Sequence, residues 1–285
     1  MLKALKQARA AMALLNPDEI LKNARRPLHI GLVGSSAESY AEMEEFLLPA
    51  SLPLEDRTYL LDKLHRVSDA GVPDSVDLIL FEQGIPATKG SYTFHRDNPG
   101  ATIREIVHGN DDIALALARQ FPAFRGPVTE RIIHAVASEN ALFAVATALP
   151  DVIPSLIELP WALGEFASDT IFITGNQIRM AFLMGAAYGK EVGLLDQKGT
   201  VLTIAAGAFG WRALARELVG KIPLGGGLIP KGAIAYAGTF AVGKALALYY
   251  SGNGVLSRAQ RRSVYREGLD RGREIAASGV SEPAN

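Results

Sequence analysis

The segment from Gly31 to Tyr40, GLVGSSAESY, holds the residues that come nearest to a known phosphate-binding motif. It continues the apolar run LHIGLVG, which is typical of a buried strand, and a helix is predicted to begin near Ala37. A strand, a glycine turn and a helix in this order form a P-loop, in which backbone N–H groups and a hydroxyl hold the phosphates and magnesium. The candidate nucleotide-binding residues are Gly31, Gly34, Ser35 and Ser36.

This P-loop pattern is incomplete because no Gly-Lys-Ser or Gly-Lys-Thr follows the glycines. The lysine supplies the main charge-assisted contact to the terminal phosphates, and Glu38 instead adds a negative charge nearby. The favoured interpretation is structural, with Ser35 and Glu38 forming a capping box for the next helix. The motif therefore predicts a vestigial site, and the pattern contains no set of residues for catalysis.

Further strands and helices surround this motif. Val76–Phe81 and Thr102–Val107 are predicted as strands, with a helix from about Asp111 to Phe121 and a surface loop over Gly84–Gly100. Alternating strands and helices predict a small, mainly parallel α/β domain. At 109–112, where a GTPase would use an Asn-Lys-x-Asp motif to read guanine, the lysine is absent, and the Asn-Asp-Asp residues there fit ordinary loop and cap chemistry.

The chain becomes helical throughout after the connection PAFRGP. Helices are predicted over Thr129–Leu149, Asn176–Gly189 and Leu228–Tyr250. Pro150, Pro154 and Pro160 interrupt the apolar stretch after the first of them. In the predicted helices over Asn176–Gly189 and Leu228–Tyr250, small residues recur every four positions. This spacing allows helix backbones to approach closely in a membrane or in a soluble bundle. We expect a membrane-associating helical domain, inserted as a hairpin rather than as independent spans.

Basic and aromatic residues in this helical part are candidates for contact with lipid or a partner protein. The candidates are Trp211, Arg212, Arg216 and Lys231. Two arginines one helical turn apart beside a tryptophan could hold a lipid phosphate, although a solvated helix edge explains the same pattern. The tail after Ser257 is rich in arginine and fits either a cytoplasmic flank or an ordinary surface helix.

Composition excludes several classes of function. The formal net charge of −1 gives no basic surface for nucleic acid. The chain has no cysteine, so disulfides, thiolate metal sites and thiol catalysis are absent, and its five histidines have no metal-ligand spacing. We therefore predict no cofactor, no metal and no nucleic-acid partner.

The blocks ITGNQIRM, GAFGWRALARELVG and IPKGAIAYAGTFAVGKA, with FPAFRGPVTERIIHAVASENALFAVATALPDVIP before them, resemble the YcjF-type bacterial domain of unknown function. The resemblance covers about 121–250, and members of that family usually have Thr-Lys-Asn-Gln where this chain has Thr-Gly-Asn-Gln at 174–177. It implies association with a membrane and attachment to a small GTPase-like domain. It carries over no catalytic residue.

Together these patterns predict four parts. They are amphipathic N-terminal helices at 1–26, a degenerate GTPase-like α/β domain at 27–121, a helical YcjF-type domain at 128–256, and a basic helix with a disordered tail at 257–285. The predicted function is that of a non-catalytic, membrane-associated binding or scaffold protein at the cytoplasmic membrane, embedded as a hairpin or peripheral. Its expected partners are lipid and an unidentified protein or a second copy. The alternatives are an active GTP hydrolase with an atypical P-loop and a soluble helical oligomer.

Overall fold

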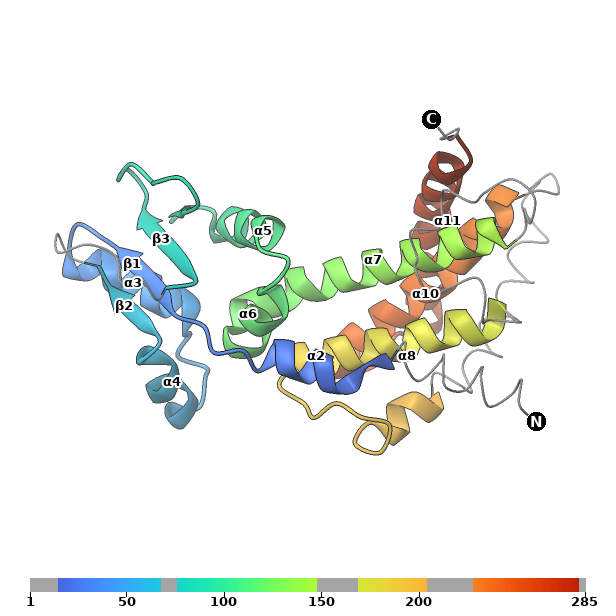
Figure 1. The fold of residues 1–285 in the computed structure, drawn as a ribbon, viewed down its shortest axis with the longest axis horizontal. Coiled ribbons are helices and arrows are strands. Elements are labelled where there is room, and N and C mark those ends of the chain that lie inside the picture. The colour runs from blue at the N-terminus through green and yellow to red at the C-terminus, as the bar shows by residue number, and fades with distance from the viewer. Residues whose placement is uncertain (1–14, 68–75, 148–168, 204–227, 282–285) are drawn as a thin grey trace. The chain divides into compact units, whose positions relative to one another are not determined.

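The fold was analysed in a computed structural model that describes residues 15–67, 76–147, 169–203 and 228–281. The chain divides into two units (Figure 1). The α/β unit comprises Leu21–Thr129 and Ala186–Lys190, and the helical unit comprises Met1–Ile20, Glu130–Gly185 and Glu191–Asn285. Each unit has its own buried core, so each is treated by itself.

The α/β unit is built on a four-stranded sheet. Its strands are β1 (Ile30–Val33), β2 (Leu64–Arg66), β3 (Leu78–Glu82) and β4 (Tyr92–Phe94), in the order β2-β1-β3-β4. Every pairing is parallel, and Ile30 lies opposite both Leu64 and Leu78. The two central strands, β1 and β3, are apolar, which suits this arrangement because a parallel sheet is covered on both faces. The predicted parallel α/β class is confirmed.

α2 (Pro17–Ala24) precedes β1, and its first residues belong to the helical unit. The other helices of this part of the chain are α3 (Ala37–Leu47), α4 (Leu54–Leu61), α5 (Pro99–Gly109) and α6 (Ala114–Gln120), with a 3-10 turn η1 (Pro122–Phe124). The buried side chains of α3 are Ser39, Met43 and Leu47, spaced by four residues as expected for one helical face. The predicted helix near 111–121 is confirmed as α6.

The predicted strand at Thr102–Val107 is wrong, because these residues form α5. Asn98 caps this helix by accepting a hydrogen bond from the Ala101 N–H, and Pro99 occupies its first turn. Thr102 is buried and donates to the Thr93 carbonyl at 3.1 Å. The strand of this region is β4, which lies inside the segment that we expected to be a surface loop.

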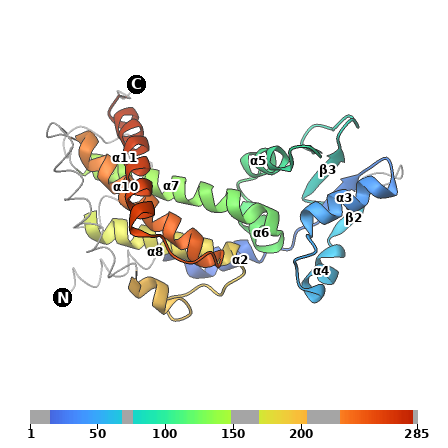
Figure 2. The same ribbon diagram turned by 180° about the vertical axis from the view of Figure 1, so that it is seen from behind.

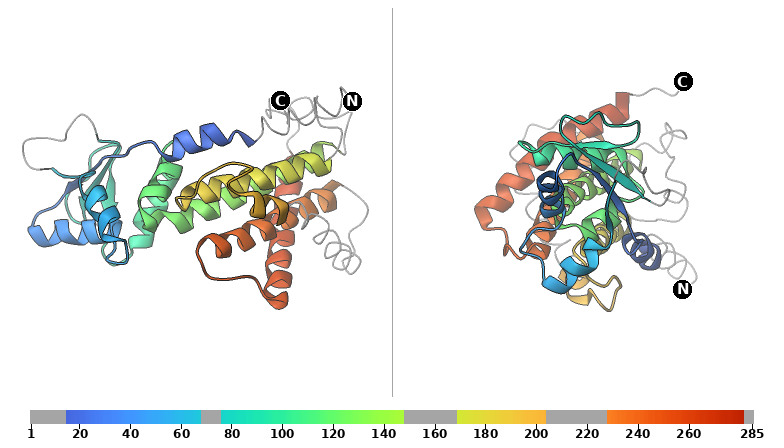
Figure 3. Two further views of the ribbon diagram at one scale, coloured as in Figure 1. Left: turned by 90° about the horizontal axis from the view of Figure 1, so that it is seen from below. Right: turned by 90° about the vertical axis from the view of Figure 1, so that its left-hand side faces the viewer.

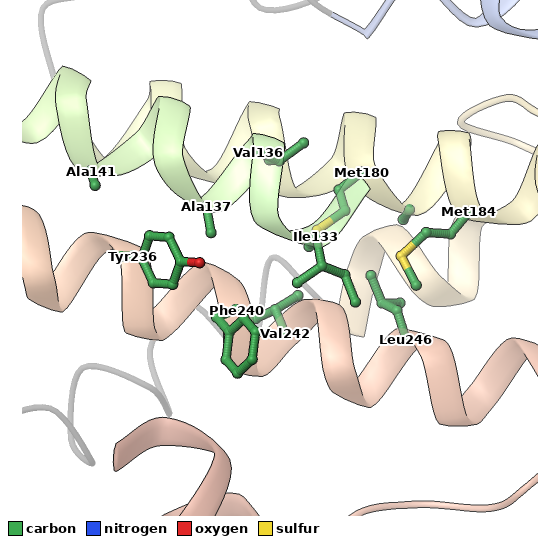
Figure 4. Packing of buried hydrophobic residues seen from close by; sticks show 11 residues of the cluster. Ile133, Val136, Ala137, Ala141, Met180, Met184, Tyr236, Phe240, Val242 and Leu246 are labelled. Atoms are coloured by element: carbon green, nitrogen blue, oxygen red, sulfur yellow. The ribbon is translucent and has the colours of Figure 1, made fainter. Parts of the chain in front are cut away.

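The long helices described in the helical unit are α8 (Asp169–Ala187), α10 (Leu228–Tyr250), α11 (Arg258–Ser281) and most of α7 (Arg125–Ala146), whose first residues belong to the α/β unit. Side chains from α7, α8 and α10 form its core (Figure 4). Ile133, Met180 and Leu246 are members, one from each helix. The helices predicted over these ranges are confirmed, and α8 begins earlier than expected.

α10 and α11 lie side by side (Figures 2 and 3). The alanine stripe of α10, which comprises Ala233, Ala237 and Ala241, packs against Tyr265 and Leu269 of α11. A Cβ added at Gly272 would lie 2.9 Å from the Cα of Ala233, and one added at Gly268 would lie 2.9 Å from the Cα of Ala237. Such close backbone approach is possible only without side chains at both glycines. The small residues of α10 thus make a helix pair within the chain.

The apolar character of these helices also bears on membranes. Among the residues that the structure describes, no helix combines the length and hydropathy required to cross a bilayer. The hairpin expected around Pro150–Pro160 lies outside the described residues.

Candidate functional site

The best candidate for a functional site is the carboxyl edge of the sheet between β1 and β3. The chain passes from β1 to one neighbour, β2, and then crosses to β3 on the other side. In doubly wound sheets, ligands bind outside the carboxyl ends of the strands at this switch point. Gly34, Ser35 and Ser36 lie here, between the end of β1 and the start of α3.

Glu82, the last residue of β3, occupies this edge with its carboxylate. The oxygen Oε2 accepts hydrogen bonds from both the backbone N–H and the hydroxyl of Ser35, each at 2.6 Å. These two hydrogen bonds are the main reason that the pKa of Glu82 is lowered from its ordinary value, since they favour the ionised carboxylate. The Glu82 carboxylate therefore accepts hydrogen bonds from two Ser35 donors of the kind that a P-loop would direct at a phosphate.

Ser36, the next residue of the turn, is used by the cap of α3. Ser36 is the N-cap residue, and its hydroxyl accepts from the Ser39 N–H at 3.1 Å, while the Ser39 hydroxyl accepts from the Ser36 N–H at 3.1 Å. The predicted capping box of Ser35 with Glu38 is therefore wrong by one residue, because Ser35 is bound to Glu82 instead. A Cβ at Gly34 would lie 2.6 Å from the Ser39 hydroxyl, so glycine makes room for the cap. Gly31, the other predicted glycine, lies within β1.

Cations at this edge are paired with carboxylates. Arg66 binds both oxygens of Glu44, at 2.7 and 2.9 Å, and Arg96 forms an ion pair with Glu42. The positive charge of Arg96 contributes in a small degree to the lowered pKa of Glu82. An anionic ligand would have to compete with these carboxylates for the cations, in addition to displacing Glu82.

The residues at the position of a guanine-reading motif also serve the fold. Asn110 donates to the Tyr92 hydroxyl at 2.7 Å and to the Ile106 carbonyl at 2.8 Å. Asp112 pairs with Arg26 at 3.3 Å. These contacts join Asn110 to β4 and to α5, and Asp112 to Arg26.

The predicted lipid or partner contacts are placed only in part. Trp211, Arg212 and Arg216 lie outside the described residues. Lys231 is half-buried near the start of α10, where its ammonium donates to the Thr147 hydroxyl at 3.2 Å. This contact joins α10 to the end of α7 and gives Lys231 a structural role.

A buried polar network in the helical unit was not predicted. The Asn140 side chain of α7 donates to the Thr239 hydroxyl of α10 at 2.8 Å and accepts from the Asn176 side chain of α8 at 3.0 Å. Gln177 donates to the same Thr239 hydroxyl at 3.3 Å. Asn140, Asn176 and Thr239 are fully buried. Of these residues, only Asn176 and Gln177 were singled out in the sequence, within the Thr-Gly-Asn-Gln segment at 174–177.

At the rim of the network, charged groups complete the hydrogen bonding. Arg179 donates to Asn176 at 3.1 Å and to the Glu139 carboxylate at 2.5 Å. The network therefore satisfies its buried amides and fixes the register of three helices, which is the role best attested for such groups. No cluster of metal-ligating side chains occurs in the described parts of either unit.

Sequence and structure comparisons add no relative from which a role could be transferred. No family model, curated protein or solved structure matches the chain.

Proposed function

We propose that this protein is a non-catalytic binding or scaffold protein that acts at a membrane. We also propose that Glu82 keeps the carboxyl edge of the sheet in the α/β unit closed to the phosphates of a nucleotide. The observation that carries the non-catalytic part of this proposal is the pair of hydrogen bonds from Ser35 to Glu82. A carboxylate at the position of a phosphate repels a phosphate. The missing lysine leaves nothing in the motif to compensate for this repulsion.

The rival activity is hydrolysis of GTP by an atypical P-loop that uses Ser35, Ser36 and backbone amides. Titration of the full chain with fluorescent GTP and GDP, with and without magnesium, separates the two. A closed edge predicts no saturable binding in the micromolar range. Magnesium-dependent micromolar binding by the wild-type protein would contradict the proposal and support the hydrolase.

A variant makes this experiment more specific. Glu82→Gln retains a hydrogen-bond acceptor for Ser35 but removes the negative charge. If nucleotide or inorganic phosphate binds to Glu82→Gln and not to the wild type, the carboxylate is what closes the edge. The control is Glu38→Gln, which removes a charge from the first turn of α3 without altering the contact to Ser35.

Association with a membrane is supported by the end of the helical unit where α10 leads into α11. Tyr249 and Val255 are 60% and 84% exposed there. The first turns of α11 carry four exposed arginines and no acidic residue between 258 and 266: Arg258, Arg261, Arg262 and Arg266. Exposed apolar and aromatic side chains beside arginines suit an anionic lipid surface. We define this set as the arginine end of the helical unit.

The remaining alternative is a soluble oligomer whose alanine seams face other subunits. In the structure, Ala233, Ala237 and Ala241 pack on α11 of the same chain. An oligomer would therefore need a different surface or a displaced α11. A sizing column with light scattering tests this, because a monomer in the absence of detergent excludes the subunit-seam arrangement.

A further inference from the structure

His134 connects three helices of the helical unit through its two ring nitrogens. Its Nδ1 lies 2.6 Å from the Tyr236 hydroxyl of α10, and its Nε2 lies 3.0 Å from an Nη1 nitrogen of Arg271 of α11. His134 itself belongs to α7. The Tyr236 side chain is a member of the core beside Ala137 and Phe240 (Figure 4).

The partners determine which nitrogen of His134 carries the proton. A guanidinium has donors only, so Nε2 must accept from Arg271 and be unprotonated. The proton of the neutral ring is then on Nδ1, which donates to the Tyr236 oxygen. A second proton on Nε2 would remove the acceptor for Arg271 and place two positive groups 3.0 Å apart.

Other charged groups face this contact from all three helices. Glu130 of α7 lies 3.9 Å from His134 and is bound at 2.7 Å by Lys244 of α10. Glu267 of α11 lies 3.4 Å from Arg271. Burial is the largest cause of the lowered pKa of His134, followed by the charge of Arg271; Lys244 lowers it further, and Glu130 and Glu267 act in the opposite direction. The neutral ring is therefore the form that the folded unit favours.

We propose that His134 is a pH-sensitive latch that holds α11 on α10 while the ring is neutral and releases it when the ring is protonated. Arg271 is adjacent in sequence to Gly272, which lies against the backbone of Ala233. A displacement of Arg271 therefore acts directly on the closest contact between α10 and α11. Packed interfaces of this kind respond by changing between discrete arrangements, not by gradual deformation.

The pH window follows from the direction of the shift. The folded-state pKa of His134 lies below the ordinary value of 6.5, so its contribution to docking is complete above pH 6.5. This contribution is lost as the pH falls through the lowered pKa, because the undocked state binds the proton more readily. The short connection 251–257, which contains Gly252 and Gly254 with positive φ, links α11 to α10 and would remain attached in the released state.

The separation of α11 from α7 can be measured directly, because the chain has no cysteine of its own. Spin labels at Ala135→Cys on α7 and Ser278→Cys on α11 occupy exposed positions of the helical unit. Double electron–electron resonance on the full chain should give a narrow distance distribution at about pH 7.5 and a broader, longer one at about pH 5, reversibly. Circular dichroism at each pH establishes that the helices persist.

Two variants test the assignment to His134. His134→Gln can accept from Arg271 and donate to Tyr236 without titrating, so its distribution should stay narrow at both pH values. Arg271→Gln removes the repulsion, and its distribution should broaden less at low pH than that of the wild type. His108→Gln, an exposed control in the α/β unit, should retain the full transition.

Two results would overturn the latch. In the first, the wild-type distance distribution does not change with pH while the protein stays folded. In the second, the pH-dependent change in distance persists unaltered in His134→Gln. If His134→Gln does not fold, the comparison rests on Arg271→Gln, where an unaltered transition likewise rejects the proposal.

Discussion

At both the sheet edge and the helical core, polar side chains form hydrogen bonds with residues that lie far away in the sequence. Glu82 accepts from Ser35 at the sheet edge, and Asn140 joins Thr239 and Asn176 in the helical core. Sequence predicted Gly34, Ser35 and Ser36 of the turn, because they are consecutive and follow a predicted strand. It could not predict Glu82 as their partner, since the two residues meet only through the parallel pairing of β1 with β3.

The hydrogen bond from Ser35 makes a measurable prediction at Glu82. Ser35→Ala removes the hydroxyl, the largest cause of the lowered pKa, and should raise the pKa of Glu82 towards its ordinary value of 4.5. Titration of the side-chain carboxyl carbons by NMR measures this. The wild-type contribution to stability is present above pH 4.5 and is lost as the pH falls through the lowered pKa. Ser91→Ala, in an exposed loop, should leave Glu82 unchanged; an equal titration in Ser35→Ala would contradict the contact.

The buried network predicts a strong coupling between Asn140 and Thr239. Asn140→Ala leaves the Asn176 and Thr239 side chains with fewer partners in a dry core and should lower the free energy of unfolding by about 2 to 4 kcal/mol. Thr239→Val removes the shared hydroxyl. In a double-mutant cycle measured by urea unfolding, the coupling energy should be about 1 to 3 kcal/mol. Ser278→Ala on the exposed face of α11 should change stability by less than about 0.5 kcal/mol. Additive effects of the two core variants would show that the hydrogen bond contributes nothing.

Among the elements, the long helices and the apolar strands β1 and β3 were predictable, and the three-residue strands β2 and β4 were not. The bounds of α10 match the apolar stretch Leu228–Tyr250 that the sequence indicated. The segment 102–107 contains four β-branched residues, which favour a strand, although Asn98 and Pro99 are a helix start signal. β2 and β4 have three residues each, too few for periodicity to be detected. Their place in the sheet depends on pairing with strands distant in sequence.

The contact of α10 with α11 predicts that two glycine substitutions of the same kind will have opposite effects. Gly272→Ala adds a methyl group 2.7 Å from the Tyr236 Cβ and 2.9 Å from the Ala233 backbone, so it should destabilise the helical unit by about 1 to 3 kcal/mol. Gly238→Ala, in α10, adds a methyl group with nothing within 4 Å and should stabilise by about 1 kcal/mol through helix propensity. Thermal unfolding followed by circular dichroism measures both. A stabilising Gly272→Ala would show that α11 does not pack on this seam.

For the molecule as a whole, a net charge of −1 conceals an uneven distribution. The arginine end of the helical unit concentrates positive charge on the first turns of α11. The arginine-rich tail was visible in the sequence. Its position beside the exposed Tyr249 and Val255 depends on how α10 ends and α11 begins.

This concentration of charge predicts how the full chain binds membranes. The triple variant Arg258→Gln, Arg262→Gln, Arg266→Gln should lose affinity for phosphatidylglycerol vesicles by about 100-fold, because each basic residue near an anionic surface contributes about 1 kcal/mol. Vesicle co-sedimentation measures this loss, and vesicles of phosphatidylcholine alone should bind neither protein. The control variant neutralises three exposed basic residues of the α/β unit, Lys22, Lys89 and Arg104, and should bind as the wild type does.

Fractionation of cells tests the same attachment in vivo. Release of the protein from the membrane fraction by high salt indicates attachment through the charge of the arginine end. Retention through high salt and alkaline carbonate indicates an embedded segment, and a chain that never sediments with membranes contradicts the membrane assignment.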